Sequence, residues 1–281
     1  MASIVAVVGQ TASGKSSLAV DIAKKFNGEI VCADSRTIYK GMDIGTAKPT
    51  MLQQQGITHY CLNIINPNQN YSVAQFKKDS LKAIDIIYSK GKVPIIVGGS
   101  GLYIDAVLYD YELDKNDIRT IDRTLDLKKL QKIALKLELK PSEQTMKNKQ
   151  HLLRFIERDG QPVTKKPTEA LILGLKLDKN TLDQRINVRV NQMFDNGLVD
   201  EAKKLEKKWG RHAPAFQTPG YGPIISYTQG ECSIEEAKHK FIQNDKNLAK
   251  KQMTWFKRNK DIIWISNILE AEQLINDYLI Q

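Results

Sequence analysis

Cysteine is scarce in this chain of 281 residues, and the three thiols present, Cys32, Cys61 and Cys232, lie far apart. An odd number of distant thiols with no C-x-x-C pair excludes a disulfide framework and a cysteine-based metal cluster, and is typical of a reducing compartment. No apolar run approaches the roughly 20 residues that a membrane-spanning helix needs. No basic leader precedes the short apolar run at the N-terminus. We therefore expect a cytoplasmic protein with no membrane partner.

Acidic side chains are also in deficit, with 32 Asp and Glu against 42 Lys and Arg, which gives a formal net charge of +10. Excess positive charge favours a polyanionic partner such as nucleic acid. The excess is uneven along the chain. Between Lys238 and Lys260 there are eight basic residues and a single acid, Asp245. This stretch is the strongest candidate for a surface that binds nucleic acid.

Short apolar, β-branched runs alternate with helical patterns over the first 110 residues. Residues 4–8 are a continuous apolar run, as expected of a buried parallel strand. After a glycine-rich turn, Leu18, Ile22 and Phe26 recur on one helical face. The sequence therefore predicts an α/β fold in which a parallel, P-loop-like sheet is flanked by helices. The other predicted strands are 30–33, 93–97, 171–175 and 262–265, and the other predicted helices are 72–88, 181–195, 198–209, 234–257 and a last one from 270.

Residues 112–168 have a different character, being rich in Lys, Leu, Asp and Glu with no convincing strand. We predict that they form a small helical insertion. Residues 1–111 and 169–281 would then form one P-loop core domain.

The segment Gly9–Ser16 reads GQTASGKS and satisfies the pattern G-x-x-x-x-G-K-[ST] between a predicted strand and a predicted helix. Its glycines let the backbone curve so that successive N–H groups point at phosphate oxygens, and the helix that follows adds its positive dipole end. Lys15 supplies a full charge, and the Ser16 hydroxyl suits Mg²⁺. The chain should bind a phosphoanhydride or diphosphate. The predicted anion-binding residues are Gly9, Gln10, Thr11, Ala12, Ser13, Gly14, Lys15 and Ser16.

One acid that an ordinary P-loop ATPase needs is missing. Such enzymes hold the metal shell with a carboxylate at the end of a later strand, but the strand at 93–97 runs into the sequence GGSG at 98–101. The nearest strand-end acid is Asp34, which follows the second strand. Because ligands bind at the carboxyl ends of parallel strands, we expect Asp34 beside the phosphate loop, where it could take a proton from an acceptor substrate.

Several other motifs accompany the phosphate loop Gly9–Ser16. They are DSRTIY at 34–39, GMDIGTAKP at 41–49, GGSGLY at 98–103, Arg185 with Arg189, GLVDE at 197–201, Gly220-Tyr221 and KKQMTW at 250–255. Taken together, these motifs resemble the tRNA dimethylallyltransferases, the bacterial isopentenyl-transferase family. The resemblance covers nearly the whole chain, and no general rule of nucleotide binding predicts its most specific piece, Gly41–Pro49.

The resemblance implies transfer of a dimethylallyl group from dimethylallyl diphosphate to N6 of the adenine 3′-adjacent to the anticodon in tRNA. It also implies Mg²⁺ at Ser16, a helical insertion that moves over the RNA, and a monomer. Lys15 and the arginines at 185 and 189 would stabilise the diphosphate leaving group, which agrees with the missing strand-end acid. Asp34 would be the base that accepts the N6 proton, with Ser100 at the same catalytic mouth.

Three segments would contact the anticodon stem-loop of the tRNA. The extruded adenine would meet the first of them, because a reacting base must leave its stack. Some positions depart from the family pattern: Thr37 stands at a usual glutamine and His151 at a usual arginine. The predicted RNA contacts are Asp34, Ser35, Arg36 and Thr37, then Gln150, His151, Leu152, Leu153 and Arg154, then Lys251 and Gln252.

Two other functions remain open on sequence grounds. A P-loop kinase of a small metabolite or nucleotide would also use Lys15, Ser16 and Asp34, and would consume ATP. An RNA-binding protein with a vestigial phosphate loop is the third possibility. The transferase hypothesis depends on one geometric expectation: the anion-binding loop and the Asp34 carboxylate must face each other across a gap.

Overall fold

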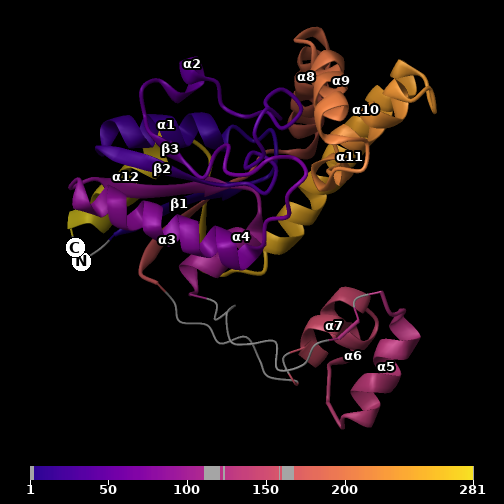
Figure 1. Ribbon diagram of the computed structural model, residues 1–281. Helices are drawn as coiled ribbons and strands as arrows, with labels where there is room; N and C mark the ends of the chain where they lie inside the picture. The colour runs from indigo at the N-terminus through magenta and orange to yellow at the C-terminus, as the bar shows by residue number, and fades with distance from the viewer. Residues whose placement is uncertain (1–2, 111–120, 123, 158, 160–167, 281) are drawn as a thin grey trace. The chain divides into compact units, whose positions relative to one another are not determined.

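The computed structural model describes residues 3–110, 121–122, 124–157, 159 and 168–280. The chain divides into two compact units (Figure 1), one formed by Met1–Leu108 with Thr168–Gln281 and the other by Tyr109–Pro167. The insertion was expected at 112–168. The predicted start of the insertion, residue 112, lies in the segment 111–120, outside the described residues.

The larger unit contains a six-stranded sheet in the order β3-β2-β4-β1-β5-β6, in which every neighbouring pair is parallel. In its centre, Val7 of β1 is paired with Val97 of β4 on one side and Leu173 of β5 on the other. The predicted parallel sheet is confirmed. Only β3 was not predicted, because two residues carry no periodic signal. The strands are β1 (Ile4–Gly9), β2 (Gly28–Ala33), β3 (His59–Tyr60), β4 (Val93–Gly98), β5 (Ala170–Leu175) and β6 (Ile262–Ile265).

Helices cover both faces of this sheet (Figure 1). On one face, α1 (Lys15–Lys25) and α12 (Ile268–Ile280) share a core with alternate strand residues such as Val5 and Val7. On the other face lie α3 (Val73–Ser89) and α4 (Gly101–Leu108). Alternating side chains of the four inner strands, β2, β4, β1 and β5, are therefore buried on both faces, as the continuous apolar runs predicted.

A second hydrophobic core joins the C-terminal helices to the segment that follows β2. Ile38 and Met42 of that segment pack with Leu205, Tyr221 and Phe241. Residues far apart in sequence are thus packed together beside the sheet. The elements concerned are α8 (Lys179–Asp195), α9 (Leu198–Trp209), a 3₁₀ turn at Pro214–Gln217, α10 (Tyr221–Thr228) and α11 (Ile234–Phe256); a short helix, α2, lies at Met51–Gln54.

The described residues of the smaller unit contain the helices α5 (Leu127–Lys136), α6 (Glu143–Met146) and α7 (Lys149–Glu157). Its own core includes Leu152 and Leu153 of α7, which are almost completely buried. These two side chains were expected to contact RNA, and their burial rules that out. Gln150, His151 and Arg154 lie on the exposed face of the same helix.

None of the helices in the described part of the chain combines the length and the apolar composition needed to cross a bilayer.

Candidate functional site

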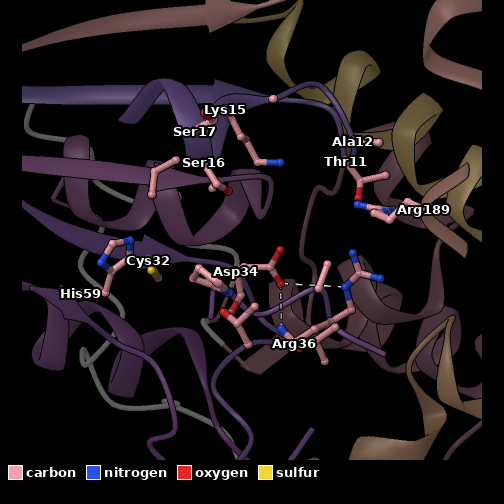
Figure 2. A pocket seen from close by; sticks show the side chains of 17 residues that line it. Thr11, Ala12, Lys15, Ser16, Ser17, Cys32, Asp34, Arg36, His59 and Arg189 are labelled. Carbon is pink, nitrogen blue, oxygen red and sulfur yellow. Dashed lines mark hydrogen bonds and ion pairs between the residues drawn. The ribbon is translucent and has the colours of Figure 1, made fainter. Parts of the chain in front are cut away.

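A cavity of about 160 Å³ lies where β1, β2 and β4 end (Figure 2). Because these strands are parallel, their carboxyl ends share one edge of the sheet, as ligand sites of α/β proteins do. The phosphate loop, the segment after β2 and helix α8 all contribute side chains. The lining residues include Thr11, Ala12, Gly14, Lys15, Ser16, Cys32, Asp34, Arg36, Thr37, Thr46, Ala47, Pro49, Val97 and Arg189.

The phosphate loop leads directly into α1 through Gly14, whose φ of 96° is in the left-handed region that favours glycine. The first residue of the helix, Lys15, donates through Nζ to the Gln10 carbonyl at 3.1 Å. Burial of the ammonium lowers the pKa of Lys15 from 10.5 to about 8, although the negative charge of Asp34 acts in the opposite direction. The hydroxyl of Ser16 lies beside Lys15 at the cavity. The loop therefore presents a partly buried cation and a hydroxyl to the cavity.

Helix α11 holds the first part of this loop, at Gln10 and Thr11, through two hydrogen bonds. Gln10 donates through its side-chain amide to the Ala249 carbonyl at 3.1 Å, and the Thr11 N–H donates to Gln252 Oε1 at 2.7 Å. Gln252 is only 7% exposed. It was expected to contact RNA, but it holds the phosphate loop instead. The Thr11 N–H, one of the loop N–H groups expected to point at the anion, is thus bound to α11, and so is the side chain of Gln10.

Asp34 follows β2 and faces the loop. Its side chain is 23% exposed, and its Oδ1 accepts the backbone N–H of Arg36 at 2.9 Å while lying 3.8 Å from the Arg36 Nε. Figure 2 shows the carboxylate pointing into the space between it and Lys15. The expected arrangement, a cation and a carboxylate on opposite sides of one gap, is present.

Two arginines converge on a buried acid next to this gap. Asp245 of α11 is 1% exposed, and its two oxygens accept Arg36 Nη1 at 3.3 Å and Arg189 Nη2 at 2.5 Å. Arg36, expected as an RNA contact, is therefore a wall of the cavity. Arg185 is turned to the loop itself, since its Nη1 donates to the Ser13 carbonyl at 3.3 Å.

The sequence reasoning did not find the role of Asp245. The available signal was its isolation, because it is the only acid between Lys238 and Lys260. A lone acid in a basic stretch that is also buried needs a partner.

Ser100 supports the segment that carries Asp34. Its Oγ accepts the Ser35 N–H at 3.0 Å and donates to the Ser35 Oγ at 3.3 Å. Thr37, in the same segment, donates through Oγ1 to the Asp34 carbonyl at 3.4 Å and lines the cavity. The arrangement gives Ser100 a positioning contact with Ser35.

The segment Gly41–Pro49 forms a further wall of the cavity and is held by a single carboxylate. Glu201 of α9 accepts three successive backbone N–H groups, those of Asp43 at 2.9 Å, Ile44 at 2.9 Å and Gly45 at 3.1 Å, and also the Tyr221 hydroxyl. A Cβ at position 45 would lie 2.6 Å from the Tyr221 ring, so only glycine fits there.

Lys48 fixes the other end of this segment. Its ammonium is buried and donates to the Tyr39 carbonyl at 2.7 Å, to Asn63 Oδ1 at 2.6 Å and to Asp43 Oδ1 at 2.6 Å. Thr46, Ala47 and Pro49 are thereby kept at the cavity.

Substituting Glu201 should therefore destabilise the protein. Glu201→Gln replaces one acceptor oxygen with an NH₂ group that meets backbone donors, and we expect the free energy of unfolding to fall by about 2 kcal/mol. Urea denaturation followed by circular dichroism measures this change. Asp200→Asn, an exposed acid on the same helix, is the control. Equal stability of the two variants would contradict the anchoring role of Glu201.

Within the described residues, no group of three or more His, Cys, Asp and Glu side chains comes together in a way that could hold a metal ion. A cation at the cavity would have to rely on Ser16, on oxygens of a bound ligand and on water. Mg²⁺ accepts this type of site, because it retains several waters and binds substrate phosphates.

Comparison with known proteins identifies the family of this chain. The family model described as IPP transferase matches residues 37–259. The chain is 39% identical over 279 residues to a tRNA dimethylallyltransferase of Macrococcus caseolyticus, covering 93% of this chain and 89% of that one. It is 38% identical over 288 residues to a protein of the same name from Lachnoclostridium phytofermentans, covering 95% and 92%.

Solved structures agree with this fold. The crystal structure of the full-length tRNA isopentenylpyrophosphate transferase from Bacillus halodurans superposes with a TM-score of 0.81 at 32% identity, covering 99% of this chain and 97% of that one. A tRNA isopentenylpyrophosphate transferase from Staphylococcus epidermidis gives 0.76 at 32% identity, covering 99% and 100%. With a family model over most of its length and relatives this similar, the chain belongs to the IPP transferase family.

Proposed function

We propose that this chain transfers a dimethylallyl group from dimethylallyl diphosphate to N6 of the adenine 3′-adjacent to the anticodon in tRNA, giving N6-(dimethylallyl)adenosine. One observation carries the proposal: a cation at the start of α1, Lys15, and a strand-end carboxylate, Asp34, line the same cavity from opposite sides. Membership of the IPP transferase family supports it.

The positive side of the cavity suits the leaving group. Breaking the allylic C–O bond places negative charge on diphosphate, and donors fixed in advance stabilise such charge without reorganising. Lys15 and the loop around Gly14 would hold one phosphate, and Arg36 and Arg189 would hold the charge that develops beside it. Arg185 keeps the loop in place through its bond to the Ser13 carbonyl.

Mg²⁺ would be held by the Ser16 hydroxyl together with diphosphate oxygens and water, and would neutralise part of the leaving-group charge. Ser16 fits this role because its hydroxyl belongs to the cavity wall next to Lys15.

Asp34 suits the acceptor side. An adenine amino group is a poor nucleophile because its lone pair is delocalised into the ring, so a carboxylate that accepts the N6 proton as the C–N bond forms assists the reaction. Apolar groups of Cys32, Ala47 and Val97 also line the cavity and suit an uncharged five-carbon unit. Ser100 positions this side through Ser35.

The RNA contacts we propose are those predicted side chains that are accessible. Ser35 and Lys251 are exposed on the core unit, and Gln150, His151 and Arg154 are exposed on α7. Thr37 would meet the adenine at the cavity. We further propose that the protein acts in the cytoplasm as a monomer on the anticodon stem-loop of tRNA.

A transfer assay tests the function. Purified protein is incubated with Mg²⁺, labelled dimethylallyl diphosphate and unmodified bulk tRNA, and digested tRNA is analysed for labelled N6-(dimethylallyl)adenosine. Label in that nucleoside supports the proposal. ATP turnover without label transfer indicates the kinase, and tRNA binding with neither reaction indicates an RNA-binding protein; either result overturns the proposal.

The low pKa of Lys15 gives diphosphate binding a pH dependence. In the ligand-free protein Lys15 loses its proton above about pH 8, whereas a bound diphosphate favours the charged form, so binding takes up a proton at higher pH. We expect affinity for dimethylallyl diphosphate to be about tenfold weaker at pH 9 than at pH 7.

Isothermal titration at several pH values measures this effect. Lys15→Arg is the control, because a guanidinium stays charged throughout this range and its profile reports only the titration of ligand and metal. Identical pH profiles for the two proteins would refute the role of Lys15 ionisation.

A further inference from the structure

We infer that Asp245 is a positioning residue for diphosphate: it aligns Arg36 and Arg189 as a pair of guanidinium groups that grip the leaving group together. The inference deepens the proposed function and rests on it for the identity of the ligand. Asp245 itself does not line the cavity, whereas both arginines do.

Asp245 joins two arginines from distant parts of the chain. Arg36 comes from the segment after β2 and Arg189 from α8, and both are paired with Asp245 of α11. Each oxygen of Asp245 accepts from a different guanidinium. A single carboxylate therefore fixes both planar groups at once, and both arginines line the cavity.

Asp245 also counters the repulsion between cations at this site. Two guanidinium groups that share one carboxylate repel each other, and the neighbouring Lys15 ammonium repels both. Asp245 is 1% exposed, so its charge is weakly screened and holds the cations together before the diphosphate arrives. A buried charge of this kind is costly to keep unless its partners are present.

Arg36 Nε lies 3.8 Å from Asp34 Oδ1, while its Nη1 is bound to Asp245. Asp245 therefore draws the end of the Arg36 side chain toward Arg189. Without it, Arg36 would be free to pair with Asp34 more closely and to move away from the diphosphate.

The test measures affinity for inorganic diphosphate with Mg²⁺ by isothermal titration, without tRNA. Asp245→Asn keeps the shape of the side chain and removes its charge, and we expect binding about tenfold weaker, as for residues that orient a binding group. In the background Arg36→Gln/Arg189→Gln, the same substitution should change affinity by less than about twofold, because Asp245 then has nothing to position. Glu235→Gln, an exposed acid on the same helix, is the control and should bind as the wild type does.

A structural role alone predicts a different pattern. It would lower the melting temperature of Asp245→Asn and weaken binding equally in both backgrounds, or leave binding unchanged; either result overturns the inference. If Asp245→Asn does not fold, Asp245→Glu retains the charge but displaces the arginines by one methylene. It should then weaken diphosphate binding by about threefold or more, and unchanged binding would overturn the inference.

The same measurements separate this inference from the proposed function. Wild-type protein that binds diphosphate with the expected dependence on Asp245, but transfers no label to tRNA, would leave the positioning role intact and remove the function. Transfer to tRNA with no dependence of diphosphate affinity on Asp245 would do the reverse.

Discussion

Replacing Asp34 with asparagine should lower kcat for prenyl transfer by about 10²- to 10⁴-fold, the usual contribution of a general base. The amide oxygen of asparagine can still accept the Arg36 N–H that Asp34 Oδ1 accepts at 2.9 Å, so the local fold is retained. The amide cannot take a proton from N6. Affinity for inorganic diphosphate should stay within about twofold, because the groups proposed to hold it are unchanged.

Single-turnover transfer to unmodified tRNA measures the kcat effect, and isothermal titration measures diphosphate affinity. Asp85→Asn, an exposed acid on α3, is the control for loss of one negative charge. A kcat for Asp34→Asn equal to that of the control would mean that another group accepts the proton. Loss of diphosphate affinity in Asp34→Asn would mean that Asp34 acts on the leaving-group side instead.

Replacing Lys15 with methionine should lower diphosphate affinity as well as catalysis, unlike Asp34→Asn. Methionine is flexible enough to occupy the space of the lysine stem, but the cavity then loses its partly buried cation. We expect kcat/KM to fall by about 10²- to 10³-fold, comparable with the removal of one donor from an oxyanion site. Diphosphate affinity should fall with it, because the charge acts on the ground state as well as on the developing leaving group.

Lys24→Met provides the matched control, since Lys24 is an exposed lysine on the same helix and donates to Gln55 Oε1 at 2.5 Å, away from the cavity lining. Parallel assays of the two lysine variants and Asp34→Asn divide the cavity into a leaving-group side and an acceptor side. If Lys15→Met binds diphosphate as tightly as Lys24→Met does, the phosphate loop is not the diphosphate site.

Much of the fold could be predicted because its signals are local. The buried strands are continuous apolar runs, and the helix α3 begins after Ser72, whose Oγ accepts the Gln75 N–H in the expected capping geometry. The meeting of Lys15 and Asp34 was also predictable, since it follows from a general property of parallel sheets. The family resemblance then supplied roles for both residues.

The rest depended on packing between distant segments. No periodic pattern indicates that Gln252 reaches the Thr11 amide or that Asp245 reaches Arg36, contacts that span more than 200 positions of sequence. Leu152 and Leu153 were placed on the RNA side by their motif, although the buried face of α7 contains both. A motif marks a segment, and only the packing decides which of its side chains face outward.

The Gly41–Pro49 segment was recognised as a motif, but the sequence alone did not explain why these residues are needed. It was the most specific piece of the resemblance and had no explanation in general rules. Its physical reason is the carboxylate of Glu201, which needs three adjacent N–H groups to approach it and a glycine at position 45 to make room for Tyr221.

The contact between Glu201 and the Gly41–Pro49 segment affects the order in which the protein folds during synthesis. A wall of the cavity belongs to the first fifth of the chain, but the side chains that hold it, Glu201 and Tyr221, are translated about 155 to 180 residues later. A nascent polypeptide can form its first strands on the ribosome well before this wall has its support. The diphosphate pocket should therefore become competent late in translation, after α9 and α10 have left the exit tunnel.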